Sequence, residues 1–253
     1  SSTPIETYGA IAQFERSPER YSIWSNFQGP FILQPLMARA LRIGGNQLRL
    51  ISAPHSGGSF GIKQGLYPYL VLLAAASRIL ECPLKWVEDR LEHLMASSSA
   101  SDRADSIEAA FDDTGQLLGL RYDNCVNVGA YVRAPEPASV YRMHAASNGC
   151  YKVRDIAVEN RMVTTNKTPI GLNRGYGGPQ FYFGLERAMD VAARQLNFDP
   201  AEIRRRNFIA PGDFPYEAPA GAIYDAGDYG KALDLLLEIS GYPDLQAKRA
   251  EAK

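Results

Sequence analysis

Hydrophobic and polar residues alternate along this chain with two periods, one typical of strands and one typical of helices. Strand-like segments alternate apolar with polar residues, whereas helical segments place apolar residues three or four positions apart. The expected strands are residues 5–14, 20–27, 48–54, 84–90, 104–112, 117–131 and 153–166. The expected helices are residues 31–43, 66–81, 90–96, 181–196, 200–209 and 228–240, followed by a charged tail. This order predicts a single α+β domain, residues 1–253, with a mixed β-sheet and packed helices.

Local signals predict several element boundaries. The sequence 112-DDTG-115 has strong turn chemistry, so the strands on either side of it should form a long hairpin. Asp199 is expected to cap the helix that follows it. Pro35 lies near the start of its helix, where proline is best tolerated, and Gly44 with Gly45 predicts the end of that helix.

Two glycine-rich loops each come directly before a helix. The first is 54-PHSGGSFGIKQG-65, and the second is 173-NRGYGGPQ-180. Glycine lets a ligand approach the backbone N–H groups, and clustered N–H groups bind anions. Arg174 adds bidentate donors suited to a phosphate or to an oxygen ligand of a metal. We therefore expect the loops to meet at a binding site; a purely structural turn and a solvated arginine are the alternatives.

Composition, charge and motifs exclude several classes of function. The chain has 27 basic and 28 acidic residues, so its charge gives no reason to expect binding to nucleic acid or to an anionic membrane. It has no apolar run of the roughly 20 residues that span a bilayer and no signal-peptide pattern, so we expect a cytoplasmic protein. Cys82, Cys125 and Cys150 form no CxxC motif, which argues against a disulfide scaffold and against an iron–sulfur or zinc site on this chain alone. The first loop lacks the pattern of a P-loop and that of a dinucleotide-binding motif, which argues against a nucleotide hydrolase.

The titratable residues outside the loops give weak signals. His55, His93 and His144 lack the spacing of a metal site or a catalytic triad. Glu88 and Asp89 are expected to fix a strand end rather than to act as an acid–base pair.

Six short motifs carry a resemblance to a known family. In chain order they are IETYGA, WSNFQGP, GGSFGIK, KWVEDR, NRGYGGPQ and DPAEIRRRN. Together they resemble the first molybdopterin-binding domain of the xanthine dehydrogenase and aldehyde oxidase family of molybdenum hydroxylases. The similarity covers nearly the whole chain at compatible spacing. It implies a fragment or split subunit of a larger enzyme that hydroxylates an aldehyde or an N-heterocycle with oxygen from water.

The resemblance places a set of residues at the cofactor. Gln28 matches the glutamine whose amide contacts an oxygen ligand of molybdenum. The backbone of Phe60 and Gly61 would lie beside the metal centre and the pterin, and Arg174 matches the loop arginine at the cofactor. Gln28, Phe60 and Arg174 would thus contact the ligands of molybdenum rather than the metal. The expected cofactor-binding set is completed by Gly57, Gly58 and Gly175.

The resemblance also implies a substrate side. Gln64 stands where purine-oxidising members carry a glutamate, and loss of that charge argues against a purine. Arg142 and Tyr176 match an arginine that orients substrate and an aromatic residue that packs on it; for Arg142 a structural role is the open alternative. Gly175 stands where relatives that oxidise carbon monoxide carry a copper-binding cysteine. Carbon monoxide is therefore not the expected substrate, although residues 84–94 resemble that bacterial branch.

The cofactor and partners follow from the resemblance as well. It implies molybdenum–molybdopterin in the cytosine dinucleotide form, and no catalytic residue on this chain, because the family's catalytic glutamate lies in a later domain. The implied partners are a second molybdopterin-binding domain or subunit, an iron–sulfur subunit and a flavin subunit with FAD, besides a small-molecule substrate. The alternative is a non-catalytic scaffold that binds partner chains without cofactor. The joint presence of Gln28, GGSFG and Arg174 favours the enzyme.

Overall fold

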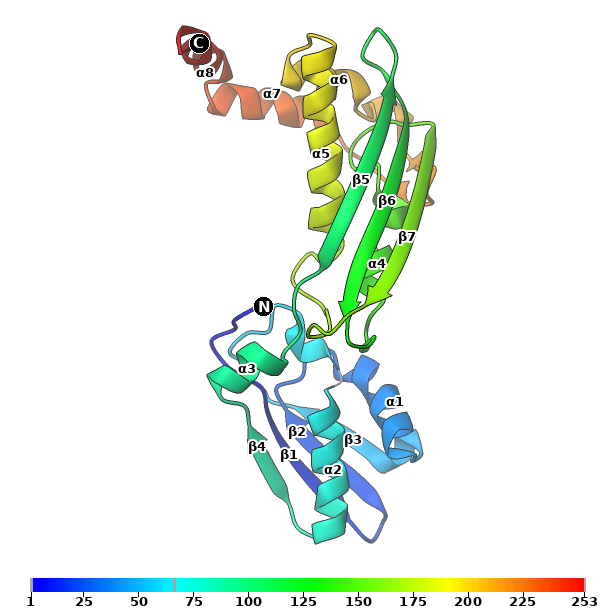
Figure 1. The fold of residues 1–253 in the computed structure, drawn as a ribbon, viewed down its shortest axis with the longest axis vertical. Helices are drawn as coiled ribbons and strands as arrows, with labels where there is room; N and C mark the ends of the chain where they lie inside the picture. Colours follow the sequence, from blue (N-terminus) through cyan, green and yellow to red (C-terminus); the bar gives the residue numbers. More distant parts are fainter. Residues whose placement is uncertain (1, 66, 253) are drawn as a thin grey trace. The chain divides into compact units, whose positions relative to one another are not determined.

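The computed structural model describes residues 2–65 and 67–252, which form two compact units (Figure 1). The first unit contains the chain up to residue 104 together with residues 125–142 and 161–177. The second contains residues 105–124, 143–160 and the chain from residue 178 onward. The expected α+β class, with a mixed sheet and packed helices, is confirmed.

The elements follow the expected order closely. The strands are β1 (Gly9–Glu15), β2 (Arg20–Ser25), β3 (Leu48–Ser52), β4 (Leu84–Val87), β5 (Asp102–Phe111), β6 (Leu117–Gly129), β7 (Asp155–Thr164), β8 (Tyr216–Glu217) and β9 (Ile223–Tyr224). The helices are α1 (Pro30–Leu41), α2 (Pro68–Leu80), α3 (Arg90–Ala96), α4 (Ala138–Tyr141), α5 (Gly178–Gln195), α6 (Pro200–Asn207), α7 (Tyr229–Ile239) and α8 (Tyr242–Glu251). The expected start of the second helix, at residue 66, lies outside the described residues.

A four-stranded mixed sheet with two helices on one face forms the first unit. The strand order is β3-β2-β1-β4; β2 and β3 run parallel, and the other pairs are antiparallel. One face of the strands buries small and branched side chains such as Ala12 and Ile23, which pack with Leu33 of α1 and Leu70 of α2. Burial of this alternating face against the two amphipathic helices stabilises the unit.

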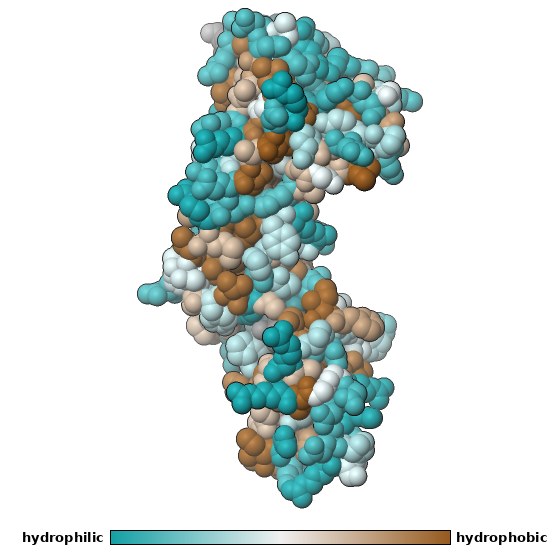
Figure 2. Space-filling model, turned by 90° about the vertical axis from the view of Figure 1, so that its right-hand side faces the viewer, coloured by the Kyte–Doolittle hydropathy of each residue, from teal (hydrophilic) through white to brown (hydrophobic). Residues whose placement is uncertain are grey.

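The opposite face of this sheet is apolar and exposed. Ile11, Trp24 and Val87 are 40%, 37% and 59% exposed, and together with Ile51 and Pro54 they border a hollow of about 420 Å³. The register places Ile11 directly across from Trp24, so these side chains form one continuous row. Figure 2 shows hydrophobic patches between hydrophilic areas on the side of the molecule that it displays.

The second unit is built on the three-stranded sheet β5-β6-β7 and helix α5 (Figure 1). Phe181, Leu185 and Met189 recur along α5 at helical spacing and pack against Leu117 and Tyr122 of β6. The expected turn between β5 and β6 forms at residues 112–115. There the Asp112 carboxylate accepts hydrogen bonds from the backbone N–H groups of Thr114 and Gln116, both at 2.9 Å.

Asn207, at the end of α6, joins that helix to the hairpin turn. Its Oδ1 accepts hydrogen bonds from the Leu117 N–H at 2.6 Å and from Gln116 Nε2 at 2.9 Å. Its Nδ2 donates to the carbonyl groups of Gly115 and Ile203, both at 2.8 Å. Asn207 is fully buried, so these four bonds satisfy groups that water cannot reach.

Replacing Asn207 with alanine should destabilise the second unit by about 3 kcal/mol, because it leaves the Leu117 N–H and the Gly115 carbonyl buried without partners. Urea unfolding of the chain, followed by circular dichroism, measures this loss. Gln195→Ala is the matched control, since Gln195 is exposed at the end of α5. Equal midpoints for the two variants would contradict this role for Asn207.

Several boundaries differ from the expectations; the first strand, for example, begins at Gly9 rather than at residue 5. Pro35 lies inside α1 rather than near its start, and α1 ends at Leu41, before the two glycines, because Arg42 adopts a left-handed conformation (φ 58°) that caps it. The expected charged tail is helical over α8, where Gly241 precedes Pro243 in the first turn.

Among the described helices, none combines the length and the apolar character that crossing a membrane requires.

Candidate functional site

The first glycine loop follows β3 and turns back on itself through residues with positive φ. Gly58 and Gly61 have φ of 99° and 108°, and Phe60 between them adopts φ of 57°. Left-handed backbone is costly for a residue with a Cβ, and such strain is concentrated at functional sites. The Ser59 hydroxyl oxygen fixes the turn by accepting hydrogen bonds from the N–H groups of Gly61 and Lys63 at 3.3 and 3.1 Å.

The backbone donors of this loop fall into two groups. The N–H of Gly57 is bound by the Glu6 carboxylate at 2.9 Å, and that of Gly61 is bound by Ser59. Within the described chain, the N–H groups of Gly58, Ser59 and Phe60 have no partner. These three consecutive amides, together with those of His55 and Ser56, are the backbone donors of the loop that remain for a ligand.

The second loop meets the first at Leu172. A Cβ added to Gly61 would lie 2.9 Å from both the Cβ and the carbonyl oxygen of Leu172. The second loop turns through Gly175 and Gly177, with φ of 81° and 82°, and the Tyr176 N–H donates to the Asn173 carbonyl at 2.8 Å. The close approach of the two backbones explains why the first loop has no side chain at position 61.

A cavity of about 220 Å³ lies where the loops meet. Its lining residues are Gln28, Phe60, Gly61, Leu172, Arg174 and Tyr176. Five of them were predicted from the sequence, and Leu172 was not. Gln28 comes from the segment between β2 and α1, Phe60 and Gly61 from the first loop, and Arg174 and Tyr176 from the second. The structure thus gathers three segments that are far apart in the sequence.

Two arginines stack on two aromatic rings at this cavity. The Arg174 guanidinium lies 5.2 Å from the ring centroid of Phe60, and that of Arg142 lies 4.5 Å from the ring centroid of Tyr176. Arg142 also donates a hydrogen bond to the Tyr176 hydroxyl. Arg174 makes no hydrogen bond or ion pair with any described residue. Stacking holds its planar group in place while its N–H donors remain free for an anion.

The other expected residues lie beside the cavity rather than on its wall. The amide of Gln64 lies against Gly29, with Nε2 3.4 Å from the position that a Gly29 Cβ would occupy. Gly57, Gly58 and Gly175 shape the loops, and Arg142 reaches the site through Tyr176. Gln64, expected on the substrate side, thus lies against the segment that follows Gln28 and not on the cavity wall.

Sequence reasoning missed an ion pair beneath the first loop. The Lys63 side chain is completely buried, and its Nζ lies 2.9 Å from Oε2 of Glu6. Lys63, helped by the Asn26 side chain and the Gly57 amide, lowers the pKa of the Glu6 carboxyl from 4.5 to about 2 against the opposing effect of burial. The folded-state pKa is depressed, so this stabilisation is present above pH 4.5 and is lost as the pH falls toward 2.

The KWVEDR motif holds the segment that carries Glu6. Arg90 donates from Nη2 to the carbonyl groups of Pro4 and Ile5, both at 2.8 Å. Glu88 accepts from the Tyr8 N–H at 3.0 Å, and Asp89 caps α3 by accepting from the Glu92 N–H at 2.8 Å. Glu88 therefore binds next to the start of β1, as expected for a carboxylate that fixes a strand end, whereas Asp89 fixes the start of a helix.

Buried His93 ties α3 to the start of the chain. Its Nδ1 lies 2.7 Å from Oε2 of Glu88 and its Nε2 lies 3.0 Å from the Ser2 carbonyl. A carbonyl only accepts, so Nε2 carries a hydrogen and donates it. His93 is a structural link and not part of the cavity.

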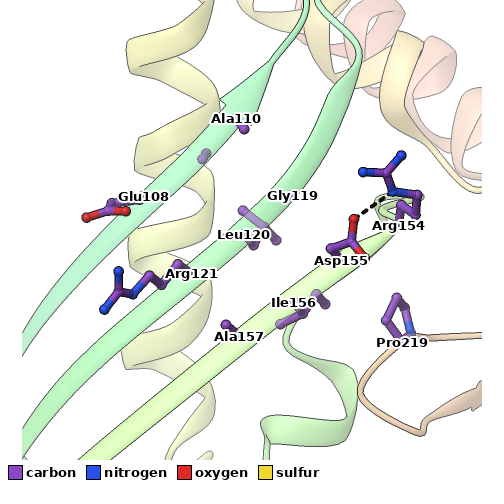
Figure 3. Close-up of a pocket in the computed structure, with 11 residues that line it drawn as sticks. Glu108, Ala110, Gly119, Leu120, Arg121, Arg154, Asp155, Ile156, Ala157 and Pro219 are labelled. Atoms are coloured by element: carbon purple, nitrogen blue, oxygen red, sulfur yellow. Dashed lines mark hydrogen bonds and ion pairs between the residues drawn. The ribbon is translucent and has the colours of Figure 1, made fainter.

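A second hollow lies elsewhere, on the outer face of the three-stranded sheet in the second unit (Figure 3). It has a volume of about 740 Å³, and its floor is formed by Ala110, Gly119 and Ala157. Its charged residues, among them Arg154 paired with Asp155 at 2.6 Å, point outward at its margins. It brings together none of the expected cofactor or substrate residues. In the parts of the chain that the structure describes, no cluster of three His, Cys, Asp or Glu side chains could hold a metal ion.

Comparison with protein families and solved structures gives consistent results. The family model of the molybdopterin cofactor-binding domain matches residues 1–208. The fold superposes with a TM-score of 0.91 on quinoline 2-oxidoreductase from Pseudomonas putida 86, at 34% identity over 100% of this chain and 32% of that one. It superposes with a TM-score of 0.90 on carbon monoxide dehydrogenase from Oligotropha carboxidovorans, at 30% identity over 98% of this chain and 31% of that one.

Curated relatives give the same picture at the sequence level. The chain is 32% identical to the nicotine 6-hydroxylase large subunit of Paenarthrobacter nicotinovorans over 256 residues, which is 100% of this chain and 31% of the relative. It is 34% identical to the carbon monoxide dehydrogenase large chain of Hydrogenophaga pseudoflava, over 98% of this chain and 31% of the relative. The chain thus spans about a third of the length of these relatives.

Proposed function

Because the chain belongs to the molybdopterin cofactor-binding domain family, we propose that it forms part of a molybdenum hydroxylase and supplies one side of its cofactor and substrate pocket. The observation that carries this proposal is the cavity at which Gln28, Phe60, Gly61 and Arg174 meet. These residues come from three separate segments, and a domain that only binds partner chains has no physical need to gather them.

The donors at the cavity fit an anionic, oxygen-rich cofactor. The free amide of Phe60 on the cavity wall, with that of Gly58 beside the cavity, offers fixed N–H donors, and the unpaired guanidinium of Arg174 adds a positive charge and a bidentate fork. The Gln28 side chain provides a neutral amide beside them. We assign the expected cofactor set, completed by Gly57, Gly61 and Gly175, to the binding of molybdenum–molybdopterin, with contacts to the ligands of the metal.

The role of each residue at the site follows from these positions. When bound, the molybdenum centre would supply two-electron oxidation with oxygen drawn from water. Gln28 and Arg174 bind and orient the cofactor from this side, and Arg142 holds the Tyr176 ring as a flat wall for the substrate. The residue that moves the proton is expected on a later domain, so this chain positions the reactants and carries no acid or base at the cavity.

The substrate class of the proposal is an aldehyde or an N-heterocycle. Relatives named for quinoline and nicotine support a heterocycle, and a flat aromatic molecule matches the Tyr176 ring. Gln64 offers no charge to a purine, and Gly175 offers no thiolate for copper, so purines and carbon monoxide fit less well.

The partners and the cofactor form belong to the same proposal. We assign the cytosine dinucleotide form of the pterin, a second molybdopterin-binding domain or subunit, an iron–sulfur subunit and a flavin subunit with FAD. Relatives named as large chains and as subunit gamma of a complex support such an assembly. The cellular location that fits it is the cytoplasm.

Elemental mass spectrometry of the full-length protein, purified with its native partners, tests this function. We expect close to one molybdenum per copy of this chain, together with iron and flavin from the partners. Intact partners without molybdenum would overturn the proposal and favour the non-catalytic scaffold. Nucleotide released by mild acid should be cytidine-derived.

A further inference from the structure

Lys63 makes bonds in three directions at the base of the first glycine loop. Its N–H donates to the Ser59 hydroxyl at 3.1 Å, which closes the turn that carries Phe60. Its carbonyl accepts from the Gln28 N–H at 3.1 Å. Its ammonium group pairs with Glu6 at 2.9 Å. One residue therefore links the glycine loop, the Gln28 segment and the start of the chain.

Glu6 contacts the same loop at a second point. Its Oε2 accepts the Gly57 N–H at 2.9 Å, and its own N–H donates to the Gly57 carbonyl at 3.2 Å. A Cβ on Gly57 would lie 2.5 Å from the Glu6 Cβ, so the two backbones touch only because position 57 is glycine. Glu6 thus holds the entry of the loop and Lys63 holds its exit.

We propose that the ion pair between Glu6 and the buried Lys63 is a positioning device that fixes the glycine loop and Gln28 relative to each other around the cavity. The proposal rests on the proposed function for its purpose, since the positioned groups are those assigned to the cofactor. Lys63 has a completely buried side chain, and a buried ammonium group must be paired to be tolerated. The lysine therefore holds Glu6, and with it Gly57, in one place. Glu6 and Lys63 themselves line no part of the cavity.

The two partners should respond unequally to substitution. Lys63→Met keeps the apolar stem and leaves a Glu6 carboxylate whose side chain is 42% exposed, so water can solvate it. Glu6→Gln leaves a buried ammonium group without a charged partner, which costs more. The double variant E6Q/K63M removes that buried charge and should be more stable than E6Q alone.

Hydrogen–deuterium exchange of the 253-residue chain, read by mass spectrometry, tests the positioning. We expect exchange of the peptide covering residues 57–64 to rise at least tenfold in K63M, while a peptide from α5 stays unchanged. The double variant should regain stability relative to E6Q without regaining protection of residues 57–64. Ile23→Val is the control, because it weakens the buried core of the same unit without touching the loop.

Unchanged exchange at residues 57–64 in K63M, or an equal rise in Ile23→Val, would overturn the positioning role. Should E6Q fail to fold, K63M and the double variant still decide the question. Molybdenum content of the full-length protein is measured in parallel and should fall at least fivefold in K63M. If exchange rises in K63M but the wild-type protein contains no molybdenum, the proposed function is wrong and the positioning role stands. If the wild-type protein contains molybdenum but exchange in K63M is unchanged, the positioning role is wrong and the proposed function stands.

Discussion

Full-length protein with Arg174→Ala should retain its fold but lose roughly 10- to 100-fold in molybdenum content or turnover, the range typical of residues that contact the ligands of a metal. Arg174 has no hydrogen bond or ion pair with any described residue, so its removal costs the fold only the stacking on Phe60. The free guanidinium is the group at the cavity that combines a positive charge with unused donors. Its loss should therefore affect the bound anion and not the stability.

Two further variants sharpen this experiment. Arg174→Lys keeps the charge but removes the planar fork, so its loss should be intermediate. Arg154→Ala is the matched control, because Arg154 is an exposed arginine in the second unit whose one ion-pair partner among the described residues is its neighbour Asp155. Metal content and turnover equal to wild type in Arg174→Ala would remove the second loop from the cofactor site. An unfolding midpoint well below wild type would show that the arginine is structural.

The second large effect is expected for Gly61→Ala. Gly61 has φ of 108°, and an added Cβ would lie 2.9 Å from the Leu172 carbonyl oxygen, a backbone atom that cannot rotate away. Backbone strain of about 1–3 kcal/mol combines with a clash of about 1–3 kcal/mol. We expect a total loss of about 2–6 kcal/mol in the first unit, together with loss of the cavity.

Gly221→Ala separates these two contributions. Gly221 has φ of 102°, yet a Cβ there would meet nothing within 4 Å, so this variant carries the strain without the clash. Urea unfolding of both variants measures the difference, and molybdenum analysis of the full-length proteins measures the effect on the site. If Gly61→Ala were no more destabilising than Gly221→Ala, the Leu172 carbonyl could not lie as close as 2.9 Å to the added Cβ.

Much of the fold could be predicted from the sequence because its signals are local. Alternation and helical spacing predicted most of the strands and the longer helices, Asp199 predicted the cap of α6, and 112-DDTG-115 predicted the hairpin turn. The errors also have local causes. The start of α1 was expected at residue 31 and lies at Pro30, but Pro35, expected near that start, is in the helix interior. Residues 242–251 were expected to form a charged tail because few of them are apolar, yet they are helical.

The candidate site was predictable only in part. The glycines and Arg174 give a signal by themselves, whereas Gln28 and Tyr176 were expected at the site only because of a family resemblance. Nothing in the sequence indicates that Lys63 is buried or that Glu6 is its partner, since lysine is almost always solvated and the two are 57 positions apart. Pairings across such distances are decided by the tertiary fold, which no local pattern reports.

These long separations have a consequence for how the protein acquires its structure. Glu6 with Lys63 and Leu117 with Asn207 close loops of 57 and 90 positions. Contacts of that kind form only after large losses of chain entropy, so they come after helices and hairpins along a folding pathway. The two polar links should therefore form after the helices and hairpins of each unit. A chain emerging from the ribosome would expose an unordered glycine loop at least until Lys63 has been synthesised and can pair with Glu6. The cavity also needs Arg174 and Tyr176 of the second loop, so a ligand that fills it would bind only after these residues have been made.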